Sequence, residues 1–181
     1  NSTLVNPAYM ARMAATYGVD SNIYKVRVLG EFPTSAVDAV IPLSLIRSAV
    51  GRLITVSPKT ATIWGLDVAR FGNDRTALCK RKGAKMLEPC RVWQNKDLMQ
   101  TAGLVKLEWD NTLAEERPIS IAVDVIGMGS GVVDRLNEMG LPVVGVNVAE
   151  SASVEDKYLR LRDELWFRAR DWFASLAVSM P

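Results

Sequence analysis

Histidine is absent from this sequence of 181 residues, and its absence removes several kinds of active site. Without an imidazole, the chain has no Ser-His or Cys-His nucleophile pair, no histidine-bound zinc and no imidazole general base. It does contain 20 aspartate and glutamate residues. Any acid–base or metal chemistry must therefore depend on carboxylates.

Cysteine is scarce, with only Cys79 and Cys90 present. The two residues fall in separate predicted strands and form no C-x-x-C motif, so neither a zinc knuckle nor a disulfide framework is expected. This usage is typical of a protein in a reducing cytoplasm.

Long apolar runs are also missing. No run reaches the roughly 18 apolar residues of a membrane-spanning helix, and the N-terminus lacks the basic and apolar regions of a signal peptide. We expect no contact with a membrane. Because the chain begins at Asn1 and stops soon after a predicted long helix, we expect it to be a piece of a larger polypeptide.

What remains is an ordinary globular composition, 49% apolar and 23% charged. Its length suits one main domain with a short appendage. The net charge is only +2, so nucleic-acid binding would require local clusters of the 22 lysines and arginines.

Residues 1–60 differ in pattern from the rest and are interpreted as a linker or flanking segment. The pattern predicts a helix over 6–18, a strand over 23–33 and a short helix over 42–52.

Residues 61–181 show a regular alternation of strands and helices. Strands are predicted over 62–70, 75–83, 85–94, 119–127 and 142–149. Helices are predicted over 97–116, 130–140 and 154–176. Three antiparallel strands followed by parallel additions is the ribonuclease H-like order. The predicted fold is therefore α/β, with a mixed five-stranded sheet flanked by helices.

The last predicted helix has one apolar stripe that should face the core, while Glu164 should point away from it. The stripe consists of Tyr158, Leu161, Leu165, Ala169, Trp172 and Leu176. All five tryptophans are interpreted as core residues rather than base-stacking platforms: Trp64, Trp93, Trp109, Trp166 and Trp172.

Two aspartates stand inside apolar strands, Asp67 in the first and Asp124 in the fourth. These strands are neighbours in a ribonuclease H-like sheet, so the carboxylates can converge. Two like charges so close need a proton or a cation between them, and oxygen ligands suit Mg²⁺ or Mn²⁺. A two-metal site for phosphodiester hydrolysis is the sharper interpretation. The plainer one is that each aspartate caps a strand or binds backbone amides.

Asp74 follows Gly-Asn in a predicted turn, where it either bonds its own backbone or assists the metal. A basic cluster surrounds this turn and the next hairpin: Arg70, Arg75, Lys80, Arg81, Lys82 and Lys85. Such a cluster is either a solvated tip or an edge that holds DNA phosphates.

The segment GMGSG at 127–131 imitates a dinucleotide-binding fingerprint, but Val132 stands where the third glycine belongs. The glycines could instead provide a tight exit from the Asp124 strand and let a DNA backbone or the next helix come near.

Four ordered segments resemble the C-terminal nuclease domain of the large terminase subunit of tailed double-stranded DNA bacteriophages. They are YGVDSNIYKVRVLGEFP, GLDVARFGNDRTAL, IAVDVIGMGSGVVDRLNEMG and YLRLRDELWFRARDWF. The resemblance implies a metal-dependent endonuclease that cuts concatemeric phage DNA. It also implies that Asp67 and Asp124 are the first and second catalytic acids.

The resemblance further implies an upstream ATPase domain, a small terminase subunit and a portal with its procapsid as partners, in the cytoplasm of a bacterial host. No GxxxxGK[ST] phosphate loop occurs here, so residues 1–60 would follow an absent motor domain. The third acid of such domains lies beyond the long helix, in a segment this sequence lacks. We therefore expect residues 61–181 to be a C-terminally incomplete nuclease domain.

Two other functions fit the same sequence. Sugar-kinase and actin-like ATPases also place an aspartate in their first strand, although their phosphate turn is richer in Gly, Ser and Thr than RFGND. A non-catalytic fragment could bind DNA or packaging partners without cutting. Thermal stabilisation by nucleotide would favour the first, and metal-independent, salt-sensitive DNA binding the second.

Overall fold

The computed structural model describes residues 6–31, 39–69 and 74–181, and the chain divides into two compact units, 1–47 and 48–181. The predicted boundary near residue 60 falls inside the second unit. The reason is that residues 48–60 include a segment bonded to the C-terminal end of the chain. Ala49 and Met180 are joined by a backbone hydrogen bond of 2.9 Å, and so are Gly51 and Met180.

The first unit is helical in its described part. It contains α1 (Pro7–Tyr17), α2 (Asn22–Tyr24) and a π-helical turn, η1 (Lys25–Leu29). The predicted helix over 6–18 is confirmed. Asn6 caps α1 by accepting a hydrogen bond from the Ala8 backbone N–H, and α1 ends before Gly18.

The strand predicted over 23–33 is wrong, because residues 22–29 are helical. Tyr24 and Val28 lie one helical turn apart and are buried together with Met13 in a small apolar cluster. Burial at this spacing favours a helix, although the alternating apolar residues of the same segment imitate a strand.

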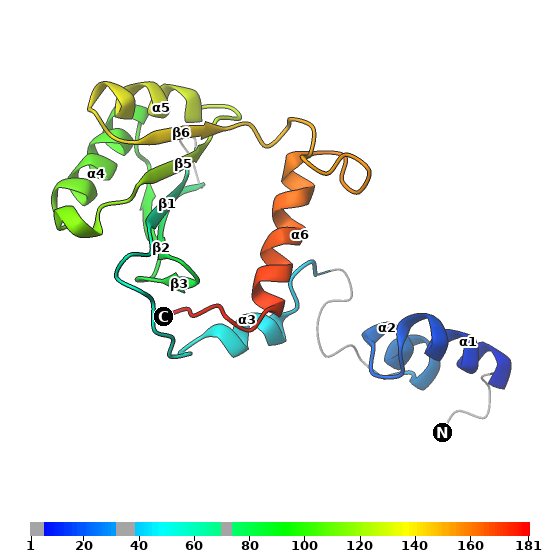
Figure 1. Cartoon of the computed structure of the whole chain (residues 1–181). Coiled ribbons are helices and arrows are strands. Elements are labelled where there is room, and N and C mark those ends of the chain that lie inside the picture. The colour runs from blue at the N-terminus through cyan, green and yellow to red at the C-terminus, as the bar shows by residue number, and fades with distance from the viewer. Residues whose placement is uncertain (1–5, 32–38, 70–73) are drawn as a thin grey trace. The chain divides into compact units, whose positions relative to one another are not determined.

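The second unit is an α/β structure (Figure 1). Helix α3 (Leu43–Ala49) contains the division between the units. The strands are β1 (Thr62–Asp67), β2 (Arg75–Lys82), β3 (Lys85–Met86), β4 (Arg91–Gln94), β5 (Ser120–Asp124) and β6 (Val143–Val146). The helices are α4 (Leu98–Asp110), η2 (Ala114–Glu116), α5 (Gly129–Glu138) and α6 (Leu161–Ala174). In the part of the chain that is described, none of the helices has the length and apolar character needed to cross a bilayer.

The sheet has the order β3-β2-β1-β5-β6, and β4 also pairs with β2. Pairs β1–β2, β2–β3 and β2–β4 are antiparallel, while β1–β5 and β5–β6 are parallel. The predicted mixed sheet flanked by helices is confirmed. It has six strands rather than five, because the predicted strand over 85–94 breaks at residues 87–90. Pro89 lies in this break and cannot donate a ladder hydrogen bond.

Cys79 and Cys90 form a disulfide, so the prediction that no disulfide would occur is wrong. Leu78 in β2 pairs with Arg91 in β4, and this pairing brings the flanking cysteines to a Cα–Cα distance of 4.5 Å. Their separation along the sequence gave no sign of that contact, since β2 and β4 meet only after the chain has passed through β3.

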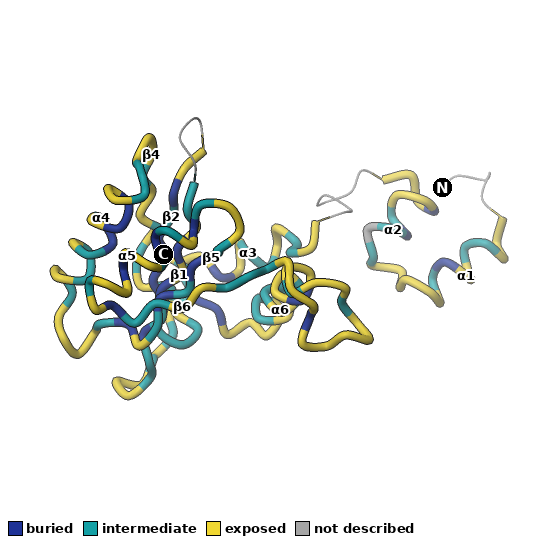
Figure 2. Tube along the Cα trace, turned by 90° about the horizontal axis from the view of Figure 1, so that it is seen from above, coloured by how far each residue is buried: buried dark blue, intermediate teal, exposed yellow. Residues whose placement is uncertain are grey.

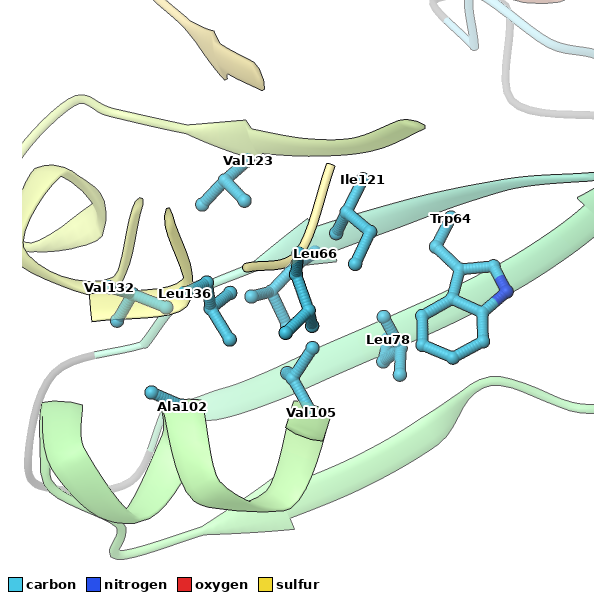
Figure 3. Packing of buried hydrophobic residues seen from close by; sticks show 10 residues of the cluster. Trp64, Leu66, Leu78, Ala102, Val105, Ile121, Val123, Val132 and Leu136 are labelled. Atoms are coloured by element: carbon cyan, nitrogen blue, oxygen red, sulfur yellow. The ribbon is translucent and has the colours of Figure 1, made fainter. Parts of the chain in front are cut away.

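The main core lies on one face of the sheet. Alternate residues of the two central strands, Trp64 and Leu66 in β1 and Ile121 and Val123 in β5, are almost fully buried. They pack against α4 and α5, as Figure 3 shows for Ala102, Val105, Val132 and Leu136. In Figure 2 the buried segments gather where these strands and helices meet. The core therefore occupies one side of the sheet.

Helix α6 departs from its prediction. It begins at Leu161 rather than near 154, and the expected apolar stripe is not buried. Glu164, expected to point away from the core, is only 1% exposed, while Trp166, expected in the core, is 56% exposed. The Glu164 carboxylate accepts hydrogen bonds from the Ser153 N–H at 2.6 Å and from its Oγ at 2.5 Å. Those bonds turn the polar side of α6 inward.

Candidate active site

The register between β1 and β5 brings the two strand aspartates to neighbouring positions. Every paired residue of β1 lies opposite the residue 57 positions later, as in Leu66↔Val123. Asp67 and Asp124 are the next positions on these parallel strands. In-register neighbours on adjacent strands point to the same face, and residues next to each other along a strand point to opposite faces. Since Leu66 and Val123 point into the core, both aspartates lie on the face that α4 and α5 do not cover.

This face is open around the two carboxylates. Asp67 is exposed and Asp124 is half-buried. Gly65, two residues before Asp67 on the same face, is exposed even though β1 is a central strand. Asp124 Oδ1 accepts a 2.9 Å hydrogen bond from the Ile126 backbone N–H. Among the described residues, nothing pairs with the Asp67 carboxylate.

The glycines after β5 bring α5 against the end of that strand. A Cβ atom on Gly129 would lie 1.8 Å from the Asp124 carbonyl oxygen, closer than any side chain can sit. Gly127 has a φ of +83°, which L residues rarely adopt. Close approach of the next helix, one of the two uses predicted for this segment, is therefore present at Gly129.

Two of the other predicted residues lie at the same end of the sheet. Arg75, the first residue of β2, is exposed and stands two positions before Ala77, the partner of Asp67, so it belongs to the same face. Asp74 immediately precedes it and is also exposed. Arg70 lies outside the described residues.

Lys80 lies on the opposite, core-facing side of β2 and is 9% exposed. Its ammonium group forms ion pairs with Glu88 at 2.9 Å and Glu108 at 2.6 Å, and it stands 4.7 Å from the centre of the Trp64 ring. The hydrogen bond donated by Lys80 is the main cause that lowers the pKa of Glu88. A lysine so engaged has no free charge for a phosphate, and we do not retain it among the DNA-binding candidates.

The remaining basic residues, Arg81, Lys82 and Lys85, lie at the other end of β2. Arg81 is four residues from Ala77, roughly 13 Å along an extended strand. Its guanidinium lies 5.9 Å from the centre of the Trp172 ring of α6. The hairpin tip is therefore apart from the two aspartates.

The donor set fits a divalent cation only in part. Carboxylate oxygens are the ligands that Mg²⁺ and Mn²⁺ prefer. Within residues 6–31, 39–69 and 74–181, however, no group of three or more Asp, Glu, Cys or His side chains is placed to hold a metal ion. Mg²⁺ commonly keeps several waters and binds through one or two carboxylates. Asp67 and Asp124 can thus hold an ion whose other ligands are water or substrate oxygens.

A cleft of about 300 Å³ adjoins Asp124 on the α6 side. Its walls are formed by Asp124, Val148, Arg162, Leu165, Trp166 and Ala169. Sequence reasoning missed Arg162 and placed Trp166 in the core. The available signal was their spacing of four residues, which puts an arginine and a tryptophan on one helix face.

Comparison with known proteins gave no match at the level of sequence: no model of a protein family matches this chain, and no curated protein does.

Solved structures do match. The nuclease domain of the large terminase subunit of bacterial virus Sf6 superposes with a TM-score of 0.62 at 14% identity, covering 77% of this chain and 66% of that domain. The large terminase nuclease of thermophilic phage G20c, solved with bound magnesium, gives 0.57 at 14% identity, covering 81% of this chain and 75% of that one. The large terminase of a second thermophilic bacteriophage gives 0.51 at 10% identity, covering 96% of this chain and 41% of that protein.

These likenesses concern the path of the backbone, since the identities are low. They include the mixed sheet on which Asp67 and Asp124 stand. The chain therefore has the ribonuclease H-like fold of the nuclease domains of phage large terminase subunits.

Proposed function

We propose that the second unit is the nuclease part of a phage DNA-packaging terminase, a divalent-metal-dependent endonuclease that cuts concatemeric double-stranded DNA. The observation that carries this proposal is the placement of Asp67 and Asp124 in register on the open face of the sheet. Asp67 is the last residue of β1 and Asp124 the last residue of β5, and a pair of carboxylates on one face supplies oxygen ligands of the kind that metal-assisted phosphodiester hydrolysis uses.

Asp67 and Asp124 would hold the metal, and Asp74, exposed at the same end of the sheet, would assist from outside the ligand pair. A divalent ion bound there would activate a water for attack on the phosphodiester and stabilise the leaving oxygen. Structures of the Sf6 and G20c nuclease domains contain manganese and magnesium, respectively, which supports oxygen-ligated Mg²⁺ or Mn²⁺ as the ion here.

The chain's own residues orient this site. The Ile126 N–H bond holds one Asp124 oxygen and leaves the other free to bind a cation. Arg75, exposed on the same face, is placed to contact a DNA phosphate. Residues 1–47 would connect this domain to an ATPase motor, with a small terminase subunit and a portal and procapsid as partners in the bacterial cytoplasm.

The test is nicking of supercoiled plasmid in Mn²⁺ by this chain. Asp67→Asn and Asp124→Asn should each lower cleavage by at least about 100-fold, because each removes a metal ligand. Asp110→Asn is the matched control, since Asp110 lies on α4 in an exposed pair with Lys106. Cleavage that persists in both active-site variants would show that the two aspartates are structural. DNA binding without cleavage by any form would favour the non-catalytic alternative.

A further inference from the structure

We propose that the cleft between Asp124 and α6 is a DNA-binding subsite, in which Arg162 contacts a backbone phosphate and Trp166 packs its ring on the adjoining sugar or base. This inference rests on the proposed function, because it takes DNA as the ligand, but it assigns residues that the nuclease proposal does not use. Five of the six cleft residues come from α6 and from the segment after β6 rather than from the strands that carry the aspartates.

The start of α6 is tied to the strand next to Asp124. The Arg162 backbone N–H donates to the Val148 carbonyl at 3.0 Å, and the Leu161 N–H donates to the Glu150 carbonyl at 2.8 Å. Val148 follows β6, whose Val146 pairs directly with Asp124. The start of α6 is thus joined by the Arg162–Val148 hydrogen bond to a residue only two positions after Val146, the strand partner of Asp124.

Both ends of α6 are held in place. At its start, Glu164 is fixed by the two hydrogen bonds from Ser153. At its end, Trp172 lies against Arg81 of β2, and Ser179 exchanges backbone hydrogen bonds with the β3 region, donating to Ala84 and accepting from Met86. A helix anchored in this way presents its side chains to the cleft at fixed positions.

Arg162 is free to bind an anion. Three other arginines at or in this helix are engaged: Arg160 donates to the Ala149 carbonyl, Arg168 pairs with Glu164, and Arg170 pairs with Asp171. In the described part of the chain, no carboxylate or carbonyl accepts from the Arg162 guanidinium. A planar guanidinium can bind a phosphate through two parallel hydrogen bonds. Placed beside Asp124, it also offsets the repulsion between that carboxylate and a phosphate.

Trp166 provides the second contact. Its side chain is 56% exposed and lies one helical turn after Arg162, on the same face. Leu165, also in the cleft, is 41% exposed. An exposed indole beside a free arginine is the combination by which proteins bind nucleic acid without reading its sequence, through ring stacking and a phosphate contact. This pairing selects DNA over an uncharged apolar partner.

The test measures binding rather than cleavage. Affinities of the 181-residue chain for a fluorescein-labelled 30-base-pair duplex and for its single strand are measured by anisotropy in EDTA, over a range of salt concentrations. Arg162→Ala should weaken binding and reduce the slope of log K against log salt by about 0.9 for the duplex, the loss of one phosphate contact. Trp166→Ala should weaken single-strand binding roughly tenfold, and Trp166→Phe should retain most of it.

Matched controls lie on the opposite side of the sheet. Arg135→Ala removes a partly exposed arginine of α5, and Leu107→Ala an exposed apolar side chain of α4. Neither substitution should change the DNA affinity, or the slope of log K against log salt, by more than the error of the measurement. If Arg162→Ala and Arg135→Ala alter the slope equally, the charge acts generally and the subsite is refuted. Thermal unfolding of each variant verifies that it folds. Arg162→Glu is a second test of the same contact and should lower DNA affinity further than Arg162→Ala does.

The outcomes separate this inference from the nuclease proposal. Loss of DNA binding in Arg162→Ala and Trp166→Ala supports the subsite even if no form of the protein cuts DNA. Cleavage that depends on Asp67 and Asp124, with DNA affinity unchanged in both cleft variants, overturns the subsite alone. Self-association that disappears in Trp166→Ala, with unchanged DNA affinity, would assign the cleft to a second copy of the chain and also overturn it.

Discussion

Glu164 shows how a single residue can reverse the expected orientation of a helix. By its pattern it belongs to the polar side of α6, yet its carboxylate is buried and accepts two hydrogen bonds from Ser153, with Arg168 beside it. The bond from the Ser153 hydroxyl is the largest of the causes that lower the pKa of Glu164. Periodicity could not reveal this, because the partner that makes burial tolerable lies eleven residues away in a loop.

The pH dependence of stability should report this site. Because the folded-state pKa of Glu164 is lowered, its stabilising effect is complete above the unfolded pKa of about 4.3 and is lost as pH falls through the folded pKa. Glu164→Gln should therefore lower the Tm at pH 7 and make the Tm fall less between pH 5 and pH 3. Thermal unfolding followed by circular dichroism measures both. Glu155→Gln, at an exposed position, is the control, and an equal loss of pH dependence there would contradict this account.

At the scale of helices and strands, the sequence predicted those features that depend on residues close together in the chain. The helix predicted to begin at 97 does so through a cap, in which Asp97 Oδ1 accepts a 2.6 Å hydrogen bond from the Gln100 N–H. The apolar strands β1 and β5 and the turn into α5 were likewise readable from their sequence. The break at Pro89 is a local effect that the sequence already carried, whereas the disulfide and the orientation of α6 depend on contacts between segments that are not adjacent in the chain. Sequence pattern alone does not contain them.

The junction between β5 and α5 should tolerate no side chain at Gly129. The added methyl would meet the Asp124 carbonyl, so Gly129→Ala should cost about 1–3 kcal/mol in the free energy of unfolding and displace Asp124. Gly103→Ala in α4 is the matched control. A Cβ there meets nothing within 4 Å, and the change should stabilise the protein by about 0.5–1 kcal/mol. Urea denaturation measures both, and equal effects would refute the steric explanation.

For the whole molecule, the division into two units has a direct consequence for truncation. Each unit has its own buried cluster, around Met13 in the first and around Trp64 in the second. Residues 48–60 belong to the second unit, where Arg52 donates to the Leu176 and Val178 carbonyls and accepts from Ser179 Oγ. The predicted boundary at residue 60 would remove these bonds.

A fragment of residues 48–181 should therefore unfold at the same temperature as the second unit in the full chain. A fragment of residues 61–181 should lose about 2 kcal/mol, because it lacks the Arg52 hydrogen bonds and the buried Ala49. Differential scanning calorimetry of the two fragments would show a Tm lower by roughly 5 °C for the shorter one. Identical melting curves would place residues 48–60 outside the folded unit.

The parallel pairing of β1 with β5 also sets a length scale. Neighbouring strands lie about 4.8 Å apart, close to the roughly 3.5–4 Å that separates the ions of two-metal sites. The distance between the Asp67 and Asp124 backbones is thus fixed by main-chain hydrogen bonding and not by the residues that connect the two strands. A loop between the two strands could be lengthened, shortened or labelled with a probe without moving either aspartate. The spacing of the strands therefore sets the distance that a bound ion or substrate must span.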